Sequence, residues 1–192
     1  MTAVLVTVLI VAATAAGVVG VRRERSVPAA GRAALLRSIA YWLLTVLIAY
    51  ELAAGALWDL LRIEYVCVVL GHLGYPMYLL LILGVWRIAG ALALLAPRFP
   101  TLKEWAYAGA FFNYTGAAAS HFLAGDRAPL WAGPLVFSVL TLGSWALRPP
   151  SRRLQDAPKT QQGYAAWMVP VLTVAAMLVV AFFTLPKGAP QL

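Results

Sequence analysis

Residues 82–114 read ILGVWRIAGALALLAPRFPTLKEWAYAGAFFNY, and they decide the fold class. An apolar run surrounds Arg87, and a turn with two prolines separates it from a second run that begins near residue 104. Each run is close to the ~20 residues that a helix needs to cross ~30 Å of hydrocarbon, whereas a strand of a membrane barrel would alternate over about ten residues. The stretch therefore predicts two membrane-spanning helices joined by a tight turn, with one charge inside the first.

The composition of the whole chain agrees with a protein whose main partner is the lipid bilayer. Hydrophobic residues make up 62% of the 192 positions and charged residues 11%, whereas soluble domains carry about 25% charged residues. The net charge of +8 does not indicate a nucleic-acid partner, because the basic residues lie between apolar segments and form no patch with interleaved aromatics. The single cysteine, Cys67, excludes an internal disulfide, a CxxC redox pair and a multi-cysteine metal site.

Six apolar segments of this kind are present, at about 3–21, 39–61, 76–96, 104–124, 129–147 and 164–185. Because a backbone in lipid must satisfy its amides within its own segment, all six are expected to be helices. The first has no positive charge before it and several arginines after it, which favours a retained anchor over a cleaved signal peptide. The sequence thus predicts an all-α, polytopic transmembrane bundle of six helices.

One further segment, 63–75, is too short to span a bilayer and too apolar to be a free loop. It is expected to form a short interfacial or re-entrant helix that is capped by Gly71 or Gly74.

Basic residues are distributed unevenly over the connections between these segments. Eleven lie between the first and second, the third and fourth, and the fifth and sixth segments, and three lie on the other side: Arg62, Arg127 and Lys187. Arg87, inside a span, completes the total of 15. The positive-inside rule then predicts that the eleven are cytoplasmic and that both termini are outside.

Arg87 is expected to share its depth in the membrane with two other polar residues, Glu51 in the second segment and Asn113 in the fourth. A lone ion at the centre of a bilayer costs at least ~2.5–3.5 kcal/mol, and an opposite charge on a neighbouring helix largely offsets that cost. Glu51 is therefore expected to pair with Arg87, with Asn113 as an additional donor and acceptor and the hydroxyl of Tyr114 nearby. Trp86, next to Arg87, is expected to pack or to line a cavity. Such a triad is either a structural clamp or the floor of a polar pocket, and ionisable residues inside a membrane favour the pocket.

Two histidines are expected nearer the outer side. His121 follows Asn113 by eight residues, so the two share one face of a helix, and His72 lies in segment 63–75. Three acidic residues are expected on the same side: Asp59, Glu64 and Asp126. Since no H-x-x-H or H-x-x-x-H spacing is present, no metal site is expected. Hydrogen bonding or proton handling near neutral pH is the favoured role for both histidines.

Residues 73–126 resemble the DoxX-like family of small bacterial membrane proteins. The matching motifs are LGYP, the span LGVWRIAGALALL with Arg87 where the family usually has lysine, RFPTLKEWAYAG, and SH before an outer GD. Glu51 in the preceding helix also matches, whereas Asn113 stands where the family often carries aspartate. The resemblance covers about 39–147 and implies a four-helix core in the bacterial cytoplasmic (inner) membrane, in a multi-pass arrangement.

This resemblance divides the chain into four parts: an anchor helix and basic cytoplasmic loop at 1–38, the core at 39–147, a basic cytoplasmic linker at 148–163, and a C-terminal transmembrane helix at 164–192. Relatives implied by the resemblance include the membrane subunit of an archaeal thiosulfate:quinone oxidoreductase, proteins of thiol-stress complexes, and eukaryotic chaperones of receptor assembly. The first and sixth helices lie outside the resemblance.

Residues and resemblance together predict a site for a lipophilic, quinone-like small molecule, within a redox or stress-response membrane complex. The candidate catalytic residues are Glu51, Arg87 and His121, and the candidate ligand-binding residues are Glu51, Trp86, Arg87, Asn113, Tyr114, His121 and His72. No cofactor motif is encoded, so a bound quinone or lipid is the only cofactor considered, and a redox centre would come from a protein partner. Two alternatives stay open. One is an intramembrane enzyme that uses Glu51 as acid or base on a lipid or isoprenoid. The other is an assembly factor or chaperone whose polar triad is only structural.

Overall fold

The computed structural model describes residues 29–97, 99–149, 152–154 and 167–190. These residues form six helices: α2 (Ala29–Leu61), α3 (Glu64–His72), α4 (Leu79–Leu95), α5 (Pro100–Leu123), α6 (Ala128–Leu147) and α7 (Met168–Phe183). The described residues contain no strand, so the all-α prediction is confirmed. The first apolar segment, 3–21, lies outside the described residues, as does most of the linker 148–163.

Helix α2 begins at Ala29 and not near residue 39, where its apolar run begins. Residues 29–38 read AAGRAALLRS, and alanine, leucine and arginine are among the strongest helix formers. The start of the apolar run is the expected start of a membrane span. The high helix propensity of residues 29–38 extends the helix beyond that point, toward the N-terminus. The part of the predicted basic loop that the structure describes, residues 29–38, is therefore helical.

Two helices are both long and apolar enough to cross a membrane, Gly31–Leu61 and Ala128–Leu147. Helices α4 and α7 are apolar but have 17 and 16 residues, which is less than the ~20 of a full span. Helix α5 has 24 residues but carries more polar side chains. Length and composition thus identify two spans, and the six-span topology stays a prediction.

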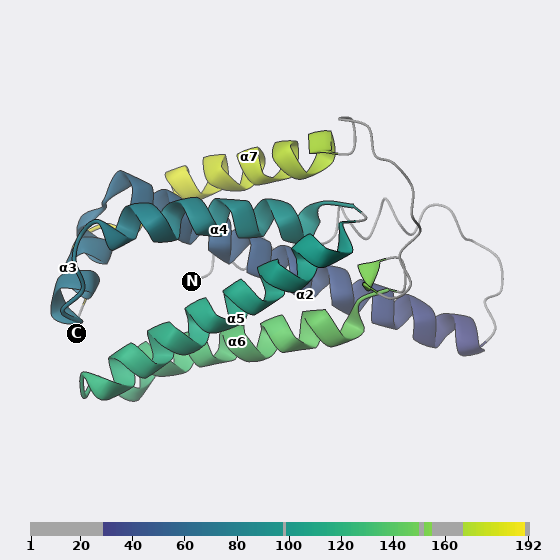
Figure 1. Cartoon of the computed structure of the whole chain (residues 1–192), viewed down its shortest axis with the longest axis horizontal. Coiled ribbons are helices and arrows are strands. Elements are labelled where there is room, and N and C mark those ends of the chain that lie inside the picture. Colours follow the sequence, from purple (N-terminus) through teal and green to yellow (C-terminus); the bar gives the residue numbers. More distant parts are fainter. Residues whose placement is uncertain (1–28, 98, 150–151, 155–166, 191–192) are drawn as a thin grey trace.

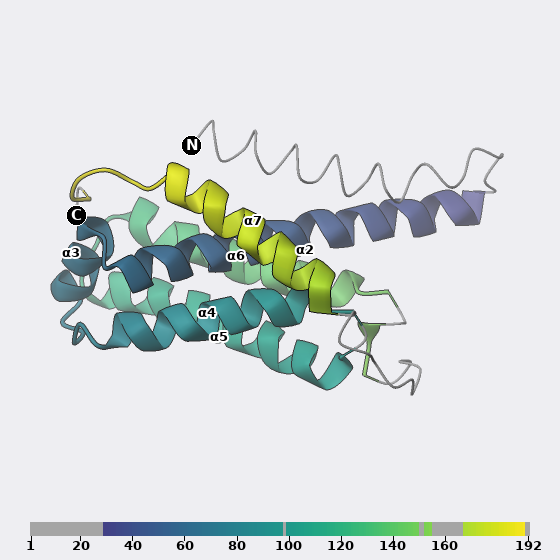
Figure 2. The same cartoon turned by 90° about the horizontal axis from the view of Figure 1, so that it is seen from above.

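Helix α2 is central to the packing: it contacts α4, α6 and α7, while α5 packs against α6 and α4. Figure 1 shows α5 and α6 side by side, and Figure 2 shows α7 crossing over α2 and α4. Alanines fill much of the buried core between these helices, among them Ala49, Ala53 and Ala91, none of which is exposed. Small residues at helix contacts let the backbones approach closely, which is how helices associate in lipid.

The short helix α3 confirms that segment 63–75 forms a helix and decides its cap, while its interfacial or re-entrant position stays a prediction. Gly74 follows the helix with a φ of 76°, a left-handed conformation that glycine adopts without steric cost. The Gly74 N–H donates to the Gly71 carbonyl at 3.1 Å, and the Tyr75 N–H donates to the Leu70 carbonyl at 3.0 Å. This pair of bonds is a Schellman motif, so Gly74 is the capping residue and Gly71 lies within the helix. We call this part of the bundle the α3 end.

At the opposite end, two basic side chains donate hydrogen bonds to the carbonyls with which α4 ends. Lys103, in the first turn of α5, has no exposed surface. Its Nζ donates to the carbonyls of Ala93 at 2.8 Å and Leu94 at 3.0 Å, and to that of Ala96. Arg152 donates to the Leu94 carbonyl at 3.2 Å. Since the last four carbonyls of a helix have no partner within it, these basic residues stabilise the end of α4.

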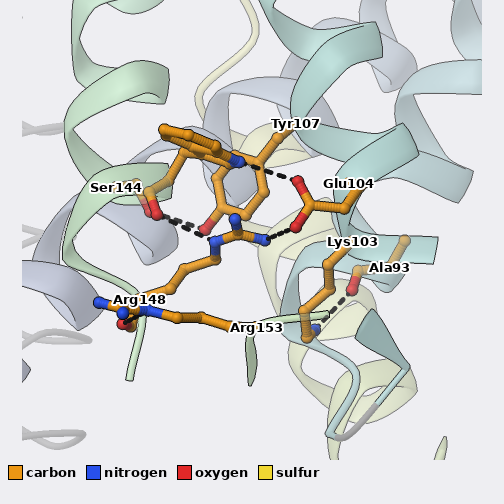
Figure 3. Close-up of polar contacts among 8 residues, drawn as sticks. Ala93, Lys103, Glu104, Tyr107, Ser144, Arg148 and Arg153 are labelled. Atoms are coloured by element: carbon orange, nitrogen blue, oxygen red, sulfur yellow. Dashed lines mark hydrogen bonds and ion pairs between the residues drawn. The ribbon is translucent and has the colours of Figure 1, made fainter. Parts of the chain in front are cut away.

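A second polar cluster at this end joins α5 to α6. Arg148 Nη1 lies 2.7 Å from Glu104 Oε1, and its guanidinium is 5.1 Å from the centre of the Tyr107 ring. Figure 3 shows the Arg148 guanidinium beside the Glu104 carboxylate, with Lys103 turned away toward Ala93. The hydroxyls of Tyr107 and Ser144 lie 2.9 Å apart. These groups are paired with one another, so the cluster holds the helices together.

Candidate functional site

Arg87 of α4 faces Gly55 of α2, with Glu51 one turn away in one direction and Asp59 one turn away in the other. Its Nη1 lies 3.0 Å from Asp59 Oδ2. The predicted pairing of Arg87 with Glu51 is therefore wrong, because the ion pair is made with Asp59. The direction of the side chain is the reason. A helical side chain extends toward the N-terminus of its own helix, and α4 begins at the α3 end, where α2 also reaches Asp59.

Gly55 is what lets the guanidinium lie against α2. A Cβ atom at this position would be 2.4 Å from Arg87 Nη1 and 3.3 Å from Arg87 Cζ. Carbon atoms in contact normally lie about 3.5–4.0 Å apart, so any side chain here would displace the arginine. Glu51, Gly55 and Asp59 follow one another at four-residue spacing and share one face of α2. The guanidinium occupies the gap between the two acids.

Glu51 has a different partner from the one predicted. The hydroxyl of Tyr114 donates a hydrogen bond to Glu51 Oε2. Tyr114 belongs to α5, which runs opposite to α4, so its side chain extends away from the α3 end and reaches the carboxylate on that side. Tyr114 is thus a buried partner of Glu51, and the two acids of this face of α2 serve different partners.

These residues surround a cavity of about 530 Å³, which lies within the usual range of ligand sites, about 300–1,000 Å³. We call it the polar cavity, and its polar and small lining residues include Glu51, Gly55, Trp58, Asp59, Arg87, Asn113, Gly116, Ser120 and His121. The rest of its wall is mostly apolar and comes from α3 and the turn after it, α4, α5 and the start of α6. Of the predicted ligand-binding residues, Glu51, Arg87, Asn113 and His121 are brought together here.

Four buried side-chain polar atoms in the described part of the chain have no hydrogen-bond partner: Trp58 Nε1, Asp59 Oδ2, Arg87 Nε and Asn113 Nδ2. All four residues line the polar cavity. The Asp59 oxygen is within ion-pair distance of Arg87 but is not aligned with it as a hydrogen bond. Leaving a buried polar group unpaired costs about 1–3 kcal/mol, and native structures rarely do so. The three unpaired N–H donors match a ligand that carries acceptor oxygens, whereas the Asp59 oxygen already lies in an ion pair with Arg87.

Near the α3 end of the polar cavity, an aspartate is held between two histidines, of which His121 lines the cavity. Gly125, with a φ of 80°, ends α5 in a second Schellman motif, in which the Asp126 N–H donates to the His121 carbonyl at 3.1 Å. The same turn places Asp126 Oδ2 2.6 Å from His121 Nδ1, while Asp126 Oδ1 lies 2.7 Å from His72 Nε2. Hydrogen bonds from His121 and then His72 lower the pKa of Asp126 below its usual value.

The two predicted histidines therefore have different positions. His121 lines the polar cavity, as its spacing from Asn113 predicts, and a neutral His121 that donates from Nδ1 keeps Nε2 as an acceptor. His72 does not line the cavity and reaches it only through Asp126. Among the described residues, no three His, Cys, Asp or Glu side chains are arranged to hold a metal ion.

The model of the DoxX-like family matches residues 43–144, more than half of the chain. The chain belongs to the DoxX-like family. The match runs from α2 to α6 and includes every residue that lines the polar cavity. Family and apolar helices together identify a membrane protein. No curated protein and no solved structure matches the chain.

A second cavity of this DoxX-like protein, of about 730 Å³, lies between α2, α4 and α5. We call it the apolar cavity, and it is lined by Leu52, Leu83, Trp86, Arg87, Ala89, Gly90, Ala93, Leu102, Trp105, Ala106, Gly109, Ala110, Phe112 and Asn113. Arg87 and Asn113 are its only charged or amide side chains. Trp86, a predicted ligand-binding residue, lines this cavity and not the polar one, and its side chain is mostly exposed.

Sequence reasoning missed two residues of the DoxX-like site, Trp58 and Asp59. Asp59 was expected near the outer histidines, because its depth was judged from its position along the segment alone. The four-residue spacing of Glu51, Gly55 and Asp59, combined with the tilt of helical side chains toward the helix N-terminus, was a signal that could have identified the right partner. No sequence signal distinguished Trp58 from the other tryptophans near the ends of segments.

Proposed function

We propose that this DoxX-like protein is a multi-pass protein of the bacterial cytoplasmic (inner) membrane that binds a neutral, lipophilic molecule of the quinone class in the polar cavity. The observation that carries the proposal is the set of three unpaired N–H donors, Trp58 Nε1, Arg87 Nε and Asn113 Nδ2, all on residues of that cavity. Carbonyl oxygens of a quinone would accept hydrogen bonds from Arg87 Nε, Asn113 Nδ2 and Trp58 Nε1. The cost of leaving these donors unpaired, about 1–3 kcal/mol each, would then be recovered on binding.

The charges around the cavity favour a neutral ligand. Asp59 balances the charge of Arg87 at 3.0 Å, so no positive charge is left over to attract an anion. Glu51, one turn away, adds a second carboxylate to the wall. An anionic ligand such as a phosphate or a carboxylate would be repelled by that carboxylate, because like charges in a low-dielectric site interact strongly. A neutral molecule with acceptor oxygens meets no such penalty.

The unpaired atoms also favour binding over a purely structural clamp. A polar cluster that only holds helices together is expected to have its hydrogen bonds satisfied within the protein, as the Lys103 contacts at the other end of the bundle are. The cluster around Arg87 is not satisfied in this way. Since the chain encodes no cofactor motif, any redox centre that acts on the ligand would belong to a protein partner in a redox or stress-response complex.

The binding test uses the purified protein in detergent and a quinone ring without a tail, 2,3-dimethoxy-5-methyl-1,4-benzoquinone. We expect saturable quenching of tryptophan fluorescence, because Trp58 lines the cavity. Asn113→Leu removes one unpaired donor and should weaken binding by about two- to twelvefold, since a hydrogen bond contributes about 0.5–1.5 kcal/mol. Arg127→Gln is the matched control, because Arg127 is exposed and lines neither cavity. Absence of saturable binding to the wild type, or equal weakening by both substitutions, would contradict the proposal.

The topology is tested separately. Under the proposal the Lys103 end faces the cytoplasm and both termini lie outside. In a Cys67→Ser background, a Leu154→Cys substitution places a single thiol at an exposed position of that end. An impermeant thiol reagent should label it in inverted membrane vesicles and not in intact spheroplasts. Labelling of intact spheroplasts would show that this end lies outside.

A further inference from the structure

The polar and apolar cavities are neighbours that share part of their walls. Leu83 and Arg87 of α4 and Phe112 and Asn113 of α5 line both of them. The unpaired Arg87 Nε and Asn113 Nδ2 therefore belong to residues that stand where the two spaces meet. A molecule bound to these donors from the polar cavity has the apolar cavity beside it.

Two glycines on one side of α5 open onto these spaces. Gly109 lines the apolar cavity and Gly116 lines the polar cavity. They are seven residues apart, about two helical turns, and a Cβ atom added at either position would meet no atom within 4 Å. Gly84, at a packed contact, differs, because a Cβ there would lie 2.7 Å from Leu60 Cγ. Both glycines are exposed, so this side of α5 is open beside each cavity and is not used for helix packing within the described residues.

We infer that the ligand is a two-part molecule, with an oxygen-bearing ring in the polar cavity and one long alkyl or isoprenoid tail in the apolar cavity. The inference rests on the proposed function, because it assigns the ring to the same polar site. The polar cavity supplies the unpaired donors, and the apolar cavity has polar side chains only where it meets the polar one. The large exposed rings of Trp86 and Trp105 form the rim of the apolar cavity.

The tail would be selected by shape and not by the hydrophobic effect. In a membrane the surrounding lipid is as apolar as the wall of the cavity, so association depends on van der Waals packing. An alkyl chain packed between Gly109 and the rings of the rim gains such contacts, and a side chain at position 109 would take its place. Filling the apolar cavity should therefore weaken binding of a tailed ligand and leave a ring without a tail unaffected.

The experiment compares two quinones with the same ring, the tail-less benzoquinone and its 6-decyl derivative, on the wild type, Gly109→Leu and Gly116→Leu. We expect Gly109→Leu to weaken binding of the decyl compound at least tenfold while changing binding of the tail-less ring less than twofold. Gly116→Leu fills the polar cavity and should weaken both at least tenfold. Partition of the decyl compound into detergent is the same for all three proteins, so it cancels when the dissociation constants are compared between variants.

Failure of this inference is distinguishable from failure of the proposed function. If the tail-less ring binds the wild type and Gly109→Leu weakens both compounds equally or neither, the ring site stands and the tail site is wrong. An unchanged affinity of Gly109→Leu for both compounds is also the result expected if a bulk phospholipid chain occupies the apolar cavity. If the tail-less ring does not bind the wild type, the proposed function is wrong.

A second measurement on the wild type covers the case in which Gly109→Leu does not fold. A decyl quinone with a diazirine at the end of its tail should crosslink to residues of the apolar cavity, such as Trp86 and Trp105, identified by fragment mass spectrometry. Excess decyl quinone without the diazirine should prevent the crosslink. Crosslinks confined to residues outside the apolar cavity would overturn the inference.

Discussion

Replacing Gly55 by alanine should destabilise the protein even though alanine is the better helix former. The new Cβ would lie 2.4 Å from Arg87 Nη1, so the guanidinium must retreat by about 1 Å or more to reach an ordinary contact distance. The 3.0 Å ion pair with Asp59 would open. Breaking a buried pair costs about 3–5 kcal/mol, and we reduce this to about 2–3 kcal/mol because the Arg87 side chain is 19% exposed. Alanine returns about 1 kcal/mol through helix propensity, which leaves a net loss of about 1–2 kcal/mol.

The assay is the free energy of unfolding of the purified protein, measured by titration with SDS in mixed micelles. Gly109→Ala is the matched control: the same substitution, at a position where the added Cβ meets no atom within 4 Å. It should leave stability unchanged or raise it by up to about 1 kcal/mol. Opposite signs for the two substitutions would support the reasoning. A Gly55→Ala protein as stable as the wild type would refute it, because the arginine would then have another equally good position.

Three further predictions follow from the contacts of single residues. A double-mutant cycle of Asp59→Asn with Arg87→Met should give a coupling of about 1–3 kcal/mol in the same assay, and the cycle of Glu51→Gln with Arg87→Met should give a clearly smaller one. Hydrogen bonds from two histidines lower the pKa of Asp126 in the folded protein. The stability that these hydrogen bonds add is therefore fully present above the ordinary aspartate pKa of about 3.9. It is lost as the pH falls through the lower pKa of Asp126 in the folded state. The thermal midpoint of the wild type should therefore fall more steeply than that of Asp126→Asn below about pH 4, and equal slopes would contradict this. Lys103→Met should leave the carbonyls of Ala93 and Ala96 without their donor and cost about 2–4 kcal/mol of unfolding free energy. A loss below about 0.5 kcal/mol would show that water reaches these carbonyls.

The amino-acid sequence by itself determined the class and the main segments of this protein. Apolar runs of helix length, without alternation, predict helices and exclude strands, and every run within the described residues is a helix. The DoxX-like core was recognisable because its motifs are contiguous in the chain, and the family match over 43–144 agrees with it. The glycine that caps α3 was also within reach, because a left-handed residue after a helix is a local requirement of the backbone. Glu51, Arg87 and Asn113, which the sequence grouped as one polar set, all line the polar cavity.

Tertiary structure alone decided how those residues pair. Two acids of α2, Glu51 and Asp59, lie one turn to either side of the position opposite Arg87, a shift of about 5 Å each way. Segment boundaries read from hydropathy are not accurate to that distance, so the choice of Asp59 required the register of α2 against α4 and the tilt of the arginine side chain. The unpaired atoms and the two adjoining cavities depend on the same register, because they exist only where separate helices pack against one another. Local physical chemistry specifies each helix, and the fit of one helix against another specifies the site.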